Sequence, residues 1–279
     1  MKTILVTGGS DGIGKGVAMH LLRSGNQVIV VGSSATKGRS FLNEAKQIGA
    51  GERATFLQAN LSLVSENKRV IEEVQTRFAS LDSVIFCATS HTTREQLTET
   101  EEGFEFNFAL SYLSRFVLSF GLKEMLEKAA KPVIVNVCAP GMNGTVNLED
   151  IQNKRNYNGA KIKYHGSRLN DLLGVAFSDL NYGKIKYVLF NPWAVQTKGY
   201  LDSIKNPINK ALARVAFKLI GKPVEKAVLP IIDHIEAPPA QKLSAYIQRK
   251  EVSLSKNTFN LDNAHQLYQK TLHLMKGEK

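Results

Sequence analysis

The chain has 279 residues, of which 43% are hydrophobic and 22% are charged, and its formal net charge is +11. This composition is typical of a globular protein with a sizeable core, and the lack of any apolar run near twenty residues excludes a membrane-spanning helix. Cys87 and Cys138 are too few cysteines for a disulfide framework, and no Cys/His spacing fits a metal site. The first residues resemble a strand rather than a signal peptide, so we expect a cytoplasmic protein.

Short apolar runs alternate with longer amphipathic stretches over the first 190 residues. Buried strands are predicted at residues 4–7, 28–31, 54–57, 84–86, 133–137 and 187–190. The segments between them have helical spacing; in 61–78, for example, Val70, Val74 and Phe78 share one face. This alternation predicts a Rossmann-type doubly wound α/β fold, with a parallel sheet and helices on both faces. Because no linker or repeat divides the chain, a single domain is expected over residues 1–279.

The last part of the chain departs from this alternation. Helices are predicted at 207–220 and from Val224, an edge strand near 246–248, and a final helix at 263–275. In doubly wound folds ligands bind beyond the carboxyl ends of the strands, so the insertion at about 192–226 is predicted to cover a substrate. A basic stripe in this insertion suits a solvated helix face, or contact with an acidic substrate, a carrier-borne phosphate or an anionic membrane. The stripe consists of Lys210, Arg214 and Lys218.

A glycine-rich turn joins the first predicted strand to the first predicted helix. It reads Thr7-Gly8-Gly9-Ser10-Asp11-Gly12-Ile13-Gly14. Glycines let the backbone turn tightly and approach a pyrophosphate, whose negative charge is favoured by a helix N-terminus. Because a strand precedes this turn and a helix follows it, the turn predicts a dinucleotide-binding site.

The T-G-x-x-x-G-x-G spacing of the turn resembles that of the short-chain dehydrogenase/reductase family, and further motifs follow in the family's order. They are Asn60-Leu61, Gly103-Phe104-Glu105, Asn136-Val137, Tyr164 with Arg168 for the family's Y-x-x-x-K, and residues 191–197 for its P-G-x-V-x-T. Tyr157-Asn158-Gly159 and the long tail are most similar to the retinol-dehydrogenase-like branch. The resemblance implies an NAD(P)(H)-dependent oxidoreductase acting on a carbonyl or alcohol of a small molecule.

The resemblance also implies which residues bind the cofactor. They are Thr7, Gly8, Ser10, Gly12, Ile13, Gly14, Ser33, Ser34, Asn60, Leu61, Ala88, Tyr164, Arg168, Pro192, Val195 and Thr197. The second predicted strand ends at Gly32-Ser33-Ser34, without the acid that binds the ribose in NAD-specific members. Lys37 and Arg39 follow shortly after. The missing carboxylate and the nearby positive charge favour NADP(H) over NAD(H).

The catalytic positions that the resemblance implies are altered. Tyr164 is expected to be the acid/base, and Arg168, on the same helical face, is expected to lower its pKa and bind the ribose. Ser111 stands where the family has an Asn, and Ala139 where it has the Ser that binds the substrate oxygen. Trp193 replaces a glycine of the family's motif. Because of their positions in these motifs, Trp193 and Ala139 are both expected to contact the substrate.

Two functions therefore remain open. One is a redox enzyme for a small-molecule substrate; the other is a degenerate dinucleotide-binding sensor or scaffold, or a non-redox enzyme such as a cyclase in the same pocket. The basic charge is interpreted mainly as solvated surface, and without a nucleic-acid motif no nucleic-acid partner is expected. Peripheral membrane contact stays open, and a homo-oligomer is suggested by analogy with the family.

Overall fold

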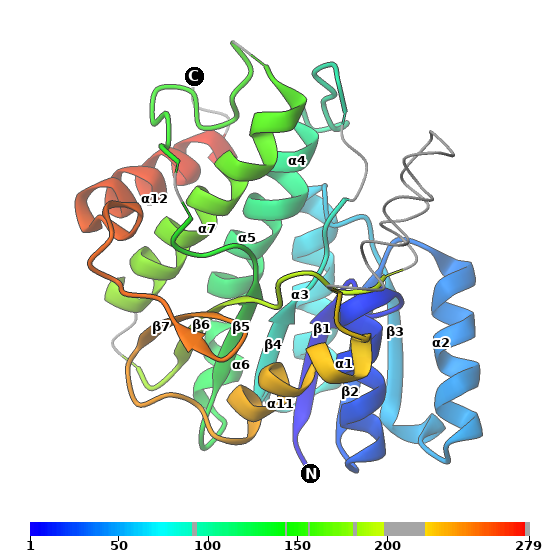
Figure 1. The fold of residues 1–279 in the computed structure, drawn as a ribbon. Helices are drawn as coiled ribbons and strands as arrows, with labels where there is room; N and C mark the ends of the chain where they lie inside the picture. The colour runs from blue at the N-terminus through cyan, green and yellow to red at the C-terminus, as the bar shows by residue number, and fades with distance from the viewer. Residues whose placement is uncertain (91–93, 143, 156, 181–182, 198–220, 277–279) are drawn as a thin grey trace.

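The computed structural model describes residues 1–90, 94–142, 144–155, 157–180, 183–197 and 221–276 (Figure 1). In these ranges one sheet has the strand order β3-β2-β1-β4-β5-β6-β7-β8. Its strands are β1 (Thr3–Thr7), β2 (Gln27–Gly32), β3 (Ala54–Gln58), β4 (Ser83–Phe86), β5 (Val133–Val137), β6 (Lys186–Asn191), β7 (Leu243–Ile247) and β8 (Lys250–Glu251). All adjacent pairs are parallel except β7 and β8. The strand order reverses beside β1, which is where doubly wound folds open a ligand crevice.

Helices cover both faces of this sheet (Figure 1). They are α1 (Gly12–Arg23), α2 (Ala35–Gln47), α3 (Val64–Arg77), α4 (Phe106–Phe108), α5 (Ser114–Gly121), α6 (Lys123–Glu127), α7 (Gly159–Leu180), α10 (Val224–Ala227), α11 (Leu229–Glu236) and α12 (Leu261–Lys276). A π-helical turn, η2 (Ala109–Leu113), joins α4 to α5, and short 3-10 turns occur at η1 (Gly51–Arg53) and η3 (Asn257–Phe259). None of the helices in the described ranges is long and apolar enough to cross a bilayer.

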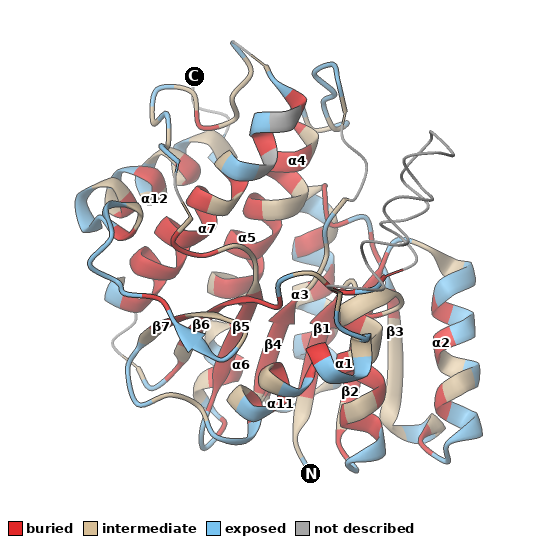
Figure 2. Ribbon diagram, in the orientation of Figure 1, coloured by how far each residue is buried: buried red, intermediate tan, exposed pale blue. Residues whose placement is uncertain are grey.

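The core consists of two apolar layers, one on each face of the sheet. Successive side chains of a strand point to opposite faces. Ile4 and Val6 accordingly pack in one layer, with residues of α1 and α11, whereas Leu5 packs in the other, with residues of α3, α5 and α7. The central strands β1, β2, β4, β5 and β6 are buried on both sides (Figure 2), which explains why they read as continuous apolar runs. The predicted doubly wound α/β fold is confirmed.

The carboxyl-terminal part differs in detail from the sequence prediction. The strand expected at the sheet edge near 246–248 is β7, which begins at Leu243 and lies between β6 and β8, so the edge assignment was wrong. β7 turns back at Gln248, whose φ of 56° allows the tight connection to β8. β8 therefore forms the edge of the sheet and pairs with the outer side of β7. The predicted final helix is confirmed as α12, and the helix expected from Val224 is divided into α10 and α11.

The predicted insertion at about 192–226 is described only at its two ends. Lys210, Arg214, Lys218 and the helix predicted at 207–220 lie outside the described residues, so their proposed role as a cover stays a prediction. At the ends, Val195 and Lys222 form a β-bridge, and the backbone amide of Gln196 donates to the Lys222 carbonyl at 3.0 Å.

Candidate functional site

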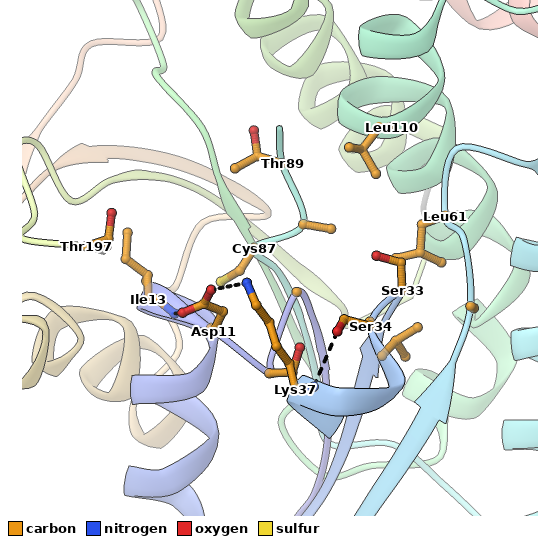
Figure 3. A pocket seen from close by; sticks show the side chains of 18 of the residues that line it. Asp11, Ile13, Ser33, Ser34, Lys37, Leu61, Cys87, Thr89, Leu110 and Thr197 are labelled. Carbon is orange, nitrogen blue, oxygen red and sulfur yellow. Dashed lines mark hydrogen bonds and ion pairs between the residues drawn. The ribbon is translucent and has the colours of Figure 1, made fainter. Parts of the chain in front are cut away.

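A cavity of about 540 Å³ opens beyond the carboxyl ends of β1, β2 and β4 (Figure 3). Many of its lining residues are those predicted to bind a cofactor: Gly8, Ser10, Gly12, Ile13, Gly14, Ser33, Ser34, Asn60, Leu61, Ala88, Val195 and Thr197. The structure adds Asp11, Val31, Gly32, Lys37, Ala59, Cys87, Thr89, Phe106, Leu110 and Ala194 to them, together with Trp193. Thr7, Tyr164, Arg168 and Pro192 are not among the lining residues. Segments far apart in the sequence thus meet at the strand-order reversal.

The glycine-rich turn forms the wall of this cavity beside α1. Gly8 and Gly12 have φ values of 64° and 53°, which residues with a side chain rarely adopt. A Cβ at Gly14 would lie 2.4 Å from the Gly8 carbonyl oxygen, so only glycine permits so tight a turn. Asp11 Oδ1 accepts a hydrogen bond from the Gly12 backbone amide at 2.7 Å and caps α1. The N-terminus of α1 therefore presents backbone amides where an anion is favoured.

Gly12 lines the cavity without a side chain. A Cβ built there would make ordinary van der Waals contact with the Thr197 side chain, at 3.5 Å, and would meet no other group within 4 Å. Thr7, which was predicted to bind the cofactor, is buried, and its Oγ1 accepts hydrogen bonds from the backbone amides of Cys87 and Ala88. It joins the ends of β1 and β4 beneath the cavity.

An ion pair lies at the mouth of the cavity, beside the end of β2. Lys37 Nζ is 2.5 Å from Asp11 Oδ2 (Figure 3), and Ser34 Oγ accepts from the Lys37 backbone amide at 3.3 Å. Partial burial works to raise the pKa of Asp11, but hydrogen bonds from Lys37 and Gly12 hold it below the ordinary value. The sequence analysis considered Lys37 as a nearby positive charge but did not consider Asp11. The acidic residue within the glycine-rich turn was the signal that could have identified this ion pair.

Arg168 does not face the cavity, contrary to the sequence prediction. Its guanidinium is buried, donates from Nη2 to the Ala139 carbonyl, and lies 3.0 Å from Asp171 Oδ2. Asp171 also accepts from the Gly141 backbone amide and from Thr258 Oγ1. Burial raises the pKa of Asp171 to about 6, although the Arg168 charge opposes that change. The pair thereby connects α7 to the loop after β5 through Arg168 and to η3 through Asp171.

We expect Arg168→Met to lower the free energy of unfolding by about 3–5 kcal/mol, because it leaves the Asp171 carboxylate buried without a counter-charge. Urea denaturation measures the loss. The double variant Arg168→Met/Asp171→Asn is the matched control: the amide oxygen still accepts from Gly141 and Thr258, so much of the stability should return. A single variant as stable as the wild type would contradict the structural role of the pair.

The other altered catalytic positions lie near the ends of β5 and η2. Tyr164 is on α7 with 59% of its surface exposed. Ser111 lies in the π-helical turn, and its backbone carbonyl accepts from Asn170 Nδ2 at 2.9 Å. Ala139 follows β5 and has no hydroxyl group. Asn107, one turn before Ser111, is buried and donates to Glu105 Oε1. Two of these positions therefore carry a hydroxyl group, the phenol of Tyr164 and the alcohol of Ser111.

Trp193 lines the cavity in a strained backbone conformation. Its φ is 65°, its side chain is 57% exposed, and its backbone amide donates to Asn191 Oδ1 at 2.7 Å. A side-chain-bearing residue in this region costs about 1–3 kcal/mol, and such strain clusters at functional sites. The position where the family resemblance places a glycine thus keeps the glycine's backbone geometry but carries a large aromatic ring beside the cavity.

Residues 2–197 match the sequence model of the short-chain dehydrogenase family. The chain belongs to this family. Its curated relatives include a human polyprenol dehydrogenase, which is 27% identical over 56% of this chain and 48% of the relative. An oxidoreductase of Emericella nidulans is 24% identical over 74% of this chain and 62% of the relative. A hydroxynaphthalene reductase-like protein of Metarhizium robertsii is 28% identical over 71% and 70%. The match thus spans about half of the human relative and less than two thirds of the Emericella protein.

Solved structures of other proteins share the fold. A short-chain dehydrogenase of Shigella flexneri complexed with NADP gives a TM-score of 0.66 at 15% identity, over 89% of this chain and 97% of that one. An alcohol dehydrogenase of Thermococcus sibiricus complexed with 5-hydroxy-NADP gives 0.64 at 16% identity, over 90% and 100%. The family assignment of the sequence analysis is confirmed; the retinol-dehydrogenase-like branch stays a prediction.

Proposed function

We propose that the protein is an NADP(H)-dependent oxidoreductase that acts on the carbonyl or alcohol of a small, fairly apolar molecule. The observation that carries this proposal is the cavity at the N-terminus of α1, where Gly12 leaves room for a pyrophosphate. Support also comes from membership of the family and from relatives that are named as reductases and dehydrogenases. A nicotinamide dinucleotide, when bound, supplies or accepts the hydride.

The lining residues fit the successive parts of such a cofactor. The backbone amides at the start of α1 would bind the pyrophosphate, and Ser33, Ser34 and Lys37 would bind a ribose 2′-phosphate. Thr197, which lines the cavity beside Gly12, would bind the carboxamide, as the family resemblance implies. Tyr164 would exchange the proton at the substrate oxygen, and Trp193 would form an aromatic wall of the substrate site. These roles, together with those of Ala139 and Ser111, are part of the proposal.

The cofactor assignment is tested by titrating the protein with NADPH and NADH and following the fluorescence of each. NADPH should bind more tightly, because β2 is followed by Ser33 and Ser34 rather than by a carboxylate that would accept the ribose hydroxyls. Tighter binding of NADH would overturn the choice of NADP(H). Binding of neither would remove the cofactor assignment itself.

The ion pair at the cavity mouth gives a sharper prediction about this preference. Asp11→Asn should raise the affinity for NADPH about threefold to tenfold and change that for NADH much less, because it removes a negative charge and frees Lys37 for the 2′-phosphate. Asparagine still caps α1, so the fold of the turn is kept. The gain should shrink at high salt, since both side chains are about half exposed. An equal gain for NADH would contradict the role of Lys37.

A second candidate function is dinucleotide binding without redox turnover, as in a sensor. One observation favours it: the guanidinium at the family's lysine position is bound to Asp171 and Ala139 rather than facing the cavity. In this function NADPH binds, but no carbonyl compound accelerates its oxidation. The two candidates are therefore separated by measuring NADPH oxidation with a panel of small apolar ketones and aldehydes.

A further inference from the structure

Arg115 is a buried cation without an opposite charge. Four charged side chains are buried in the described part of the chain: Glu105, Arg115, Arg168 and Asp171. Arg168 and Asp171 form an ion pair, and Glu105 accepts the Phe108 backbone amide at the start of α4. Within the described ranges Arg115 makes no ion pair. Because unpaired charges are rarely buried, its charge needs an explanation beyond stability.

The contacts of Arg115 fix its position but leave its charge uncompensated. Nη1 lies 2.5 Å from Asn136 Oδ1 and 3.3 Å from Asn170 Oδ1, and Nη2 donates to the Ala88 carbonyl at 3.2 Å. These acceptors are all neutral, and Nε has no acceptor. Burial lowers the pKa of Arg115, yet a guanidinium stays protonated at neutral pH. A full positive charge is thus held rigidly between the end of β4, β5 and α7.

This charge lies directly behind the cavity wall. Ala88, whose carbonyl accepts from Arg115, lines the cavity together with its neighbours Cys87 and Thr89. In Figure 3, Cys87 and Thr89 lie between Thr197 and the side of the cavity where Ser33 and Ser34 are. In the proposed function the nicotinamide lies on the Thr197 side and the adenosine on the Ser33 side. The segment Cys87–Thr89 would therefore lie beside the middle of the bound cofactor, where the nicotinamide half begins.

We infer that Arg115 makes the protein discriminate between the two oxidation states of its cofactor and retain the reduced one. This inference rests on the proposed binding of NADP(H). When NADPH gives up a hydride, its nicotinamide ring becomes a cation, while its phosphate charges stay the same. A fixed positive charge behind the ring site consequently disfavours NADP⁺ relative to NADPH. For unit charges about 10 Å apart at an effective dielectric constant of about 20, the effect is a factor on the order of ten in affinity.

The experiment compares dissociation constants for NADP⁺ and NADPH in the wild type, Arg115→Gln and Arg115→Lys. The ratio of the NADP⁺ constant to the NADPH constant should fall about tenfold in Arg115→Gln and stay near the wild-type value in Arg115→Lys. Adenosine 2′,5′-bisphosphate, which lacks the nicotinamide, is the control ligand. Any change in its affinity measures the effect of Arg115 on the phosphates, which NADP⁺ and NADPH share and which therefore cancels in their ratio.

A second variant tests the inference if Arg115→Gln does not fold. Asn136→Asp puts a carboxylate against Arg115 Nη1, at the cost of the hydrogen bond that Asn136 Nδ2 donates to Asn170 Oδ1, so the ratio should fall as in Arg115→Gln. A ratio unchanged in both Arg115→Gln and Asn136→Asp, with adenosine 2′,5′-bisphosphate still bound, would overturn the inference and leave Arg115 a structural residue. Failure of the wild type to bind either NADPH or NADP⁺ would instead refute the proposed function, and this inference with it.

Discussion

Gly12→Val is expected to lower the affinity for NADPH at least about a hundredfold, without unfolding the protein. A Cβ at this position already contacts Thr197, at 3.5 Å, so the methyl groups of a valine would extend into the cavity beside the start of α1, where the pyrophosphate is proposed to bind. A loss of two or three charge-assisted hydrogen bonds to backbone amides, each about 1.5–3 kcal/mol, accounts for a change of this size. Fluorescence titration with NADPH measures it.

Backbone strain must be separated from blocked binding in this experiment, because φ at Gly12 is 53°. Gly25→Ala is a matched control: φ at Gly25 is 83°, the residue is exposed, and nothing lies within 4 Å of its Cβ position. That variant should lose some stability but keep its NADPH affinity. If Gly12→Val bound NADPH as well as the control does, the pyrophosphate would not lie at the start of α1, and the site would have to be reassigned.

Tyr164→Phe is expected to reduce turnover by about a hundredfold to ten-thousandfold, the usual contribution of a positioned acid or base, while leaving NADPH affinity unchanged. The reason is that Tyr164 carries a phenol, a stronger acid than the alcohol of Ser111, and that Ala139 has no hydroxyl group. The loss of NADPH absorbance with an active carbonyl substrate measures turnover. Its phenol is 59% exposed and therefore accessible to a substrate.

Tyr268→Phe provides the comparison for this variant. Tyr268 lies on α12, where its ring packs against Phe116 and Phe120 at centroid distances of 5.6 and 5.2 Å, so removing its hydroxyl should leave turnover intact. Equal turnover in Tyr164→Phe and the wild type would assign the proton transfer to another group. An absence of turnover in the wild type with every carbonyl compound tested would favour the second candidate, dinucleotide binding without redox chemistry.

The cavity was predictable from the sequence largely because its signals are local. The glycine-rich turn requires backbone conformations that only neighbouring residues determine, and the apolar runs at 4–7 and 28–31 determine the strands on which the turn and Ser33 are mounted. Asp11 was missed because the significance of an acid in the turn depends on Lys37, twenty-six residues away, reaching its carboxylate. Cys87 was not among the residues predicted to bind the cofactor; that it lines the cavity follows from where β4 ends beside β1.

The sequence by itself determined the doubly wound fold and the dinucleotide turn, since strand periodicity and glycine spacing are properties of short segments. It also identified Tyr164 and Arg168 as neighbours on one helical face. Only the tertiary structure decided which way the arginine points. The free energy of a buried guanidinium depends on a counter-charge, and Asp171, fixed by Thr258 from a distant segment, supplies it away from the cavity. For Arg115 no such partner lies within reach in the described chain, so the packing of β4, β5 and α7 leaves its charge behind the cavity wall.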